Sequence, residues 1–102
     1  MNSINNIEIR IREYTSMDIN IIPSTLKVYV KGEEKDIDQD TIDNLLTIIC
    51  KWEHEYIDDT ILDAPTCRVR IFTDRGVDDY FMMGKFPTTY REFYEIVRGI
   101  YG

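Results

Sequence analysis

The sequence has little of what most specialised protein classes require. Its 102 residues include one histidine, two cysteines, three prolines, five glycines and, at Ala64, a single alanine. Two cysteines are too few for a disulfide framework, so we expect Cys50 and Cys67 to be reduced, buried side chains of a cytoplasmic protein. No apolar run approaches the ~20 residues of a membrane span, and the polar N-terminus does not resemble a secretory signal. With 43% hydrophobic residues, the composition predicts one folded domain over residues 1–102.

Acidic residues are concentrated in one third of the chain. The sequence carries 19 acidic and 12 basic residues, a net charge of −7. Between Glu33 and Asp63, eleven acidic residues occur with only Lys35 and Lys51, so this segment carries −9 and the rest carries +2. The overall sign opposes non-specific binding to duplex nucleic acid. Solubility would explain the excess of acid, and so would a partner with a basic surface.

The hydrophobic pattern predicts an α+β domain. Sixteen isoleucines favour sheet, and alternating apolar residues at Ile7, Ile9 and Ile11 indicate a strand with one buried face. Residues 16–24 are ambiguous and suggest a short extended piece. The other predicted elements are a strand near 26–31, a short strand near 35–37, a helix over 39–56, a hairpin over 67–83 and a helix over 89–98. The order ββ(β)-α-ββ-α predicts a two-layer sandwich, with a mainly antiparallel sheet and both helices on one face.

Both predicted helices carry recognisable ends. Asp38 or Asp40 can cap the first, whose apolar stripe comprises Ile42, Leu45, Ile49, Trp52 and Tyr56. Glu53 falls within that stripe, so we expect either a paired, buried carboxylate or a helix end close enough for it to reach water. In the second helix, Thr89 and Glu92 have the spacing of a capping box, and Gly99 is the expected C-cap.

Known enzyme motifs are absent from the sequence. It contains no phosphate-binding loop, no Gly-x-Ser-x-Gly and no His-Glu-x-x-His. Cys50 and His54 lie four residues apart, which would suit two metal ligands on one helix face, but no second close pair completes a site. A core cysteine beside an exposed histidine explains the same spacing. We therefore expect no enzyme activity, no metal and no cofactor.

Two surfaces are candidates for binding. One is an acidic patch around the first helix: Asp36, Asp38, Asp40, Asp43, Glu55, Asp58 and Asp59. The other is the sheet face opposite the helices, with bases and aromatics that suit a nucleotide or single strand: Arg10, Arg12, Tyr29, Arg68, Arg70 and Phe72. Cross-strand pairing with Glu8, Glu33 and Asp74 would neutralise this second face instead.

The C-terminal part of the chain resembles small uncharacterised bacterial or phage α+β proteins. The resemblance rests on the strand pair, the Gly84-Lys85-Phe86-Pro87 step and the aromatic helix that follows, together with the segment 51–56. It extends over roughly the last 75 residues and carries no activity and no catalytic residues with it. It implies a small bacterial or phage-borne domain.

Taken together, these features favour a non-enzymatic, acidic protein-binding module. We expect an inhibitor or immunity-type protein that acts on a partner with a basic surface, because acidic side chains complement basic clefts and speed encounter. The alternative is a sheet face that binds single-stranded nucleic acid or a nucleotide. We expect no membrane association, and the exposed aromatics also suggest a homodimer through the sheet face.

Overall fold

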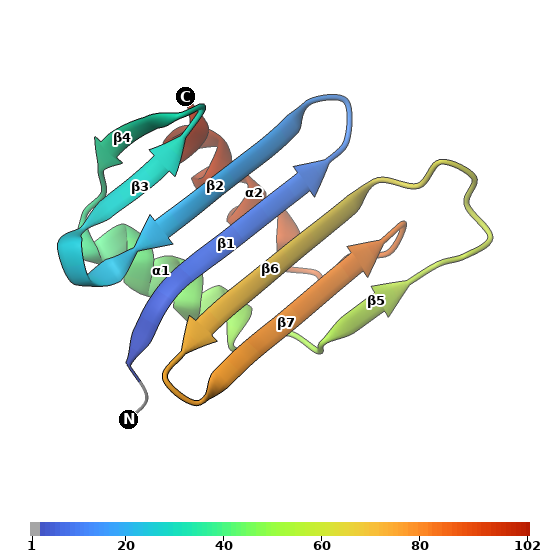
Figure 1. The fold of residues 1–102 in the computed structure, drawn as a ribbon. Helices are drawn as coiled ribbons and strands as arrows, with labels where there is room; N and C mark the ends of the chain where they lie inside the picture. The colour runs from blue at the N-terminus through green and yellow to red at the C-terminus, as the bar shows by residue number, and fades with distance from the viewer. Residues whose placement is uncertain (1–2) are drawn as a thin grey trace.

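A computed structural model describes residues 3–102 as a seven-stranded sheet with two helices (Figure 1). The elements are β1 (Ile4–Arg12), β2 (Ser16–Ile22), β3 (Lys27–Val30), β4 (Glu33–Asp36), α1 (Gln39–Ile49), β5 (Glu55–Ile57), β6 (Thr66–Thr73), β7 (Gly76–Met83) and α2 (Tyr90–Tyr101). The strand order is β4-β3-β2-β1-β6-β7-β5, and every neighbouring pair is antiparallel except β5 and β7. The predicted α+β class is confirmed.

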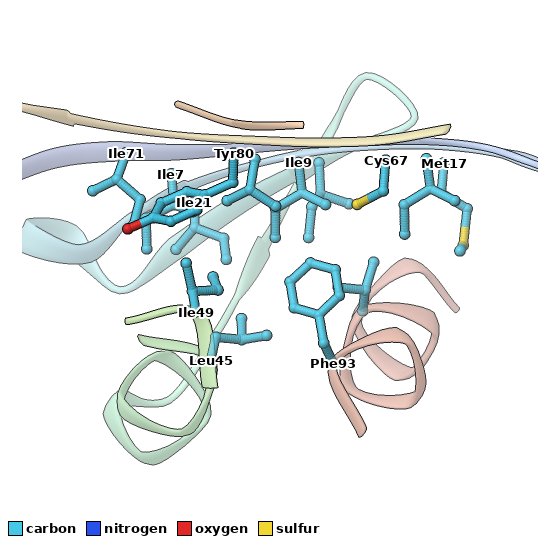
Figure 2. Close-up of a cluster of buried hydrophobic side chains, with 14 of the residues drawn as sticks. Ile7, Ile9, Met17, Ile21, Leu45, Ile49, Cys67, Ile71, Tyr80 and Phe93 are labelled. Carbon is cyan, nitrogen blue, oxygen red and sulfur yellow. The ribbon is translucent and has the colours of Figure 1, made fainter. Parts of the chain in front are cut away.

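One face of the sheet is apolar and carries the core. Every second residue of a strand points to the same side, and Ile7, Ile9 and Ile11 of the central strand β1 are fully buried. Figure 2 shows both helices packed against this face, with Leu45 of α1 and Phe93 of α2 pointing into the strand side chains. Neither helix of residues 3–102 lies over the opposite face (Figure 1). None of the helices within residues 3–102 has the length and apolarity to cross a membrane.

The N-terminal half of the sheet is more complete than the sequence predicted. Residues 16–22, which were ambiguous, form the full strand β2, and its Ile19 and Ile21 point into the core. The short return strand covers Glu33–Asp36 rather than 35–37. The predicted strand near 26–31 begins one residue later, at Lys27, because Leu26 follows a 3₁₀ turn in a left-handed conformation (φ 53°), where it is exposed.

Helix α1 is shorter than predicted, because the chain after it becomes a strand. The helix ends at Ile49, and residues 54–58 run beside β7: the Phe81 N–H donates to the His54 carbonyl (2.9 Å) and the Asp58 N–H donates to the Met83 carbonyl (2.8 Å). Trp52 still reaches the core, where its ring meets Phe93 edge-on at 4.9 Å. Glu53 lies in the turn and is exposed, so its carboxylate reaches water.

Helix α2 runs further than predicted and begins without the expected side-chain cap. It passes through Gly99 and ends at Tyr101, with Gly102 as its C-cap. The Thr89 hydroxyl does not cap the first turn. Instead it accepts a hydrogen bond of 2.8 Å from the indole N–H of Trp52, which joins the end of the α1 segment to the start of α2.

Candidate functional site

The predicted basic face is assembled on the uncovered side of the sheet. Register places Arg10 opposite Arg68, Glu8 opposite Arg70, and Tyr29 two strands away beside Asn20. All six residues predicted for this face therefore share one surface: Arg10, Arg12, Tyr29, Arg68, Arg70 and Phe72.

Each charged or phenolic group of this set is paired with a carboxylate of the same chain. Arg68 donates two hydrogen bonds to Asp79 (3.0 and 2.8 Å), and Arg12 donates two to Asp18 (2.7 and 3.2 Å). The remaining pairs of the set are Arg10 with Glu8 at 3.1 Å, Arg70 with Glu8 at 3.9 Å and with Asp79 at 3.8 Å, and Tyr29 with Glu34 at 3.0 Å. Lys27, on the same strand as Tyr29, pairs with Asp36. The hydrogen bonds from Arg68 lower the pKa of Asp79, and the bond to Asp18 raises the pKa of Arg12.

The acids that neutralise this face are only partly those expected. Glu8 pairs as predicted, but the ion pairs found among residues 3–102 do not include Glu33 or Asp74. Glu33 lies opposite Val30, whose side chain is buried on the helix side, and Asp74 lies in the turn after β6. Asp18 and Asp79 take their places because register sets them beside arginines. The guanidinium of Arg68 also lies 5.3 Å from the centre of the Phe81 ring. It therefore covers an aromatic ring on which a nucleobase of a ligand could otherwise stack.

The seven predicted acidic residues do not form one patch. Asp36, Asp38, Asp40 and Asp43 lie around β4 and the start of α1, whereas Glu55, Asp58 and Asp59 lie in and after β5. Since β4 and β5 are the two edge strands, these two groups of acidic residues lie at opposite edges of the sheet (Figure 1).

The acidic residues near β4 have local structural partners. Asp36 pairs with Lys27, and the Asp38 carboxylate accepts the Thr41 N–H (2.9 Å) at the first turn of α1. Hydrogen bonds from Thr41 lower the pKa of Asp38. Asp43 accepts a hydrogen bond from the side-chain amide of Gln39 (2.9 Å). This group contributes mainly to strand pairing and helix capping.

The acidic residues near β5 are interspersed along the chain with exposed aliphatic residues. We name residues 55–63 the acidic loop: its carboxylates are Glu55, Asp58, Asp59 and Asp63. Between them, Leu62 is 91% exposed and Ile57 and Ile61 are each 44% exposed. Asp58 accepts from the Thr60 N–H and hydroxyl, which lowers the pKa of Asp58. The sequence indicated the acidic residues, but not that the neighbouring aliphatic side chains would stay exposed.

The acidic loop is held in place by β7 and the residue that follows it. The Gly84 N–H donates to the carbonyl of Pro65 (3.0 Å), two residues beyond the end of the loop. Gly84 has φ +71°, and a Cβ there would lie 3.1 Å from the Asp58 carbonyl oxygen and 3.2 Å from Ile61 Cδ1. The loop therefore presents its side chains in a defined arrangement.

Cys50 and His54 both follow the last residue of α1 rather than lying within the helix. Because α1 ends before them, they do not share a helix face; Cys50 is exposed, contrary to expectation, and its thiol donates to the Thr47 carbonyl (3.2 Å). His54 stacks on Tyr80 with ring centres 4.7 Å apart. Cys67 is buried as predicted. Residues 3–102 contain no cluster of three His, Cys, Asp or Glu side chains that could hold a metal ion.

The ion pairs separate the charge of the molecule into a balanced face and an acidic remainder. Five basic and four acidic residues take part in the ion pairs found among residues 3–102. Fifteen acidic and seven basic residues lie outside these pairs. Comparison with protein-family models, with curated proteins and with solved structures found no match to this chain.

Proposed function

We propose that the protein is a non-enzymatic, acidic protein-binding module whose acidic loop engages a basic surface of its partner. The observation that carries the proposal is the exposure of Leu62, Ile57 and Ile61 among four carboxylates at one edge of the sheet. Apolar side chains ringed by charge are typical of protein interfaces, where the apolar centre gives affinity and the charged rim sets partner and rate.

The distribution of charge supports the same conclusion. Arginines on the uncovered sheet face are paired with carboxylates of the same chain, so the charge left outside the ion pairs of residues 3–102 is mainly acidic. Inhibitors of nucleic-acid enzymes and toxin-neutralising immunity proteins have this size and charge. A cytoplasmic inhibitor of that kind, of bacterial or phage origin, is the role we propose.

The test compares two variants with the same change in charge. The loop variant carries Glu55→Gln, Asp59→Asn and Asp63→Asn. The matched control carries Glu33→Gln, Asp40→Asn and Asp43→Asn, at and near the opposite edge of the sheet, β4. The partner is first isolated from cells with the wild-type chain, and association rates are then measured at low salt. We expect the loop variant to associate about 10-fold more slowly, because steering depends on charge near the contact. Equal rates for the two variants would contradict the proposed surface.

The second candidate function is binding of a nucleotide or single-stranded nucleic acid on the sheet face. The convergence of four arginines and two aromatics on one surface favours it, but a ligand phosphate would have to displace Asp18, Asp79 or Glu8. Titration with a single-stranded oligonucleotide distinguishes the two functions: steeply salt-dependent binding would favour the sheet face. A homodimer through that face stays a prediction, and a one-chain mass by sedimentation at low and high salt would contradict it.

A further inference from the structure

Two loops that are distant in the sequence meet at one end of the sheet. The turn between β1 and β2 and the segment between β5 and β6 together line a hollow of about 370 Å³; its residues are Arg12, Glu13, Tyr14, Asp63, Ala64 and Pro65. Tyr14, which lines this hollow, is fully exposed, and so is most of Leu62, the residue that precedes the lining residue Asp63 in the chain. Figure 1 shows both loops at the same end of the neighbouring strands β1 and β6.

The hollow is negatively charged. Arg12 is its one basic residue, and both of its hydrogen bonds to Asp18 point that guanidinium along the sheet. Neither Glu13 nor Asp63 takes part in an ion pair found among residues 3–102. A side chain that enters the hollow therefore meets two carboxylates, a tyrosine ring and the apolar surface of Ala64 and Pro65.

We propose that this end of the sheet, which we name the apex surface (Glu13, Tyr14, Ile61, Leu62 and Asp63), receives a lysine or arginine of the partner that is flanked by apolar residues. The inference rests on the proposed function and deepens it, because it adds the β1–β2 turn to the contact. A basic group complements Glu13 and Asp63, while Tyr14 and Leu62 pack against its apolar neighbours. A second copy of this chain does not fit, since it would set these carboxylates against their equivalents.

The apex surface is suited to binding because its large exposed side chains would become buried when a partner binds. Tyrosine is enriched among residues that dominate interface energies, and it loses little conformational freedom on contact. The positive φ of Asp63 (52°) and the Gly84–Pro65 hydrogen bond fix one side of the hollow before binding. Less ordering is then required when the partner docks.

The experiment titrates the isotope-labelled chain with acetyl-Leu-Arg-amide and follows its amide signals by NMR. Acetyl-Leu-Gln-amide, which lacks the charge, is the control probe. We expect the arginine peptide to shift signals of residues 12–14 and 61–64 at millimolar concentration, with smaller shifts from the glutamine peptide. Shifts at Asp40 and Asp43 alone, or no shifts at all, would overturn the inference, while the association-rate comparison decides the proposed function separately.

Matched substitutions complete the test on the isolated partner. Tyr14→Ala and Leu62→Ala remove the two apolar anchors, and Leu26→Ala and Val77→Ala remove side chains that are 39% and 52% exposed elsewhere. All four keep the fold, because surface substitutions seldom change stability. We expect the apex pair to weaken partner binding at least about 10-fold and the control pair to leave it unchanged. Unchanged binding by the apex pair, or equal loss in the control pair, would overturn the inference.

Discussion

At the scale of single residues, Trp52 reaches the core although the helix in which it was predicted ends three residues before it. It follows the end of α1, yet it is buried among Tyr80 and Phe93, with ring centres 6.4 and 4.9 Å away. Burial of an indole requires a partner for its N–H, and the Thr89 hydroxyl supplies it. The sequence pattern S/T-x-x-E assigned that hydroxyl to a helix cap, because a local motif carries no information about a tryptophan 37 residues away.

Replacement of Thr89 by valine should therefore destabilise the protein. Thr89→Val keeps the shape and removes the acceptor, which leaves a buried indole N–H unpaired, so we expect a loss of about 1–3 kcal/mol in the free energy of unfolding. Thr88→Val is the matched control, because Thr88 is exposed, and it should change stability by less than about 0.5 kcal/mol. Urea denaturation measures both, and equal effects would contradict the role of this hydrogen bond.

At the scale of elements, local patterns predicted the secondary structure well wherever one face is buried. The isoleucine alternation of β1, the hairpin of β6 and β7 and the start of α1 at Asp38 were all evident in the sequence. The end of α1 was not, since Trp52 and Tyr56 continue the helical spacing while the backbone pairs with β7. Propensity cannot anticipate a strand of three residues whose partner residues in the neighbouring strand occur 26 positions later.

The face of α1 that is buried can be tested with two adjacent leucines. Leu45 is fully buried under the sheet, whereas Leu46 is only partly buried at the side of the helix. We expect Leu45→Ala to cost about 2–5 kcal/mol in the free energy of unfolding, and Leu46→Ala clearly less, because the lost transfer energy and cavity scale with burial. Thermal or urea unfolding checks the order, and a larger effect at Leu46 would mean that the helix is rotated.

At the scale of the whole molecule, composition predicted the charge but not its arrangement. The sequence showed that residues 33–63 are acidic and that alternate strand positions are basic. It could not show that β4 and β5 would become opposite edges and divide the acidic residues, because strand order depends on long-range pairing. Nor could it give the register that places Asp18 and Asp79 beside arginines. The candidate residues were therefore found, but their grouping was not.

A global test of the fold uses the thiol of Cys67. It is completely buried under the sheet, and this burial raises its pKa from 9.0 to about 12, whereas an unfolded thiol keeps the ordinary value. A raised acid pKa means that the thiol form is favoured by folding. Its contribution is fully present below pH 9 and is lost as pH rises towards 12, with a slope of up to about 1.4 kcal/mol per pH unit.

We therefore expect the stability of Cys67→Ala to fall less steeply between pH 9 and 12 than that of the wild type. Cys50→Ala removes an exposed thiol and should keep the wild-type slope. The free energy of unfolding at several pH values gives the three slopes. Parallel curves for wild type and Cys67→Ala would show that the thiol of Cys67 does not ionise differently in the two states.

The position of β5 outside β7 has a consequence for the order in which the chain can fold during synthesis. Residues 55–57 leave the ribosome before residues 76–83, which form their neighbour strand, so the earlier segment must wait for the later hairpin. The helix and the four N-terminal strands can pair in sequence, but this edge closes over a long chain separation and is entropically slow. The segment that carries Leu62 and its carboxylates is thus completed only after β7 (Gly76–Met83) has emerged, and a chain that stops short of β7 does not display it.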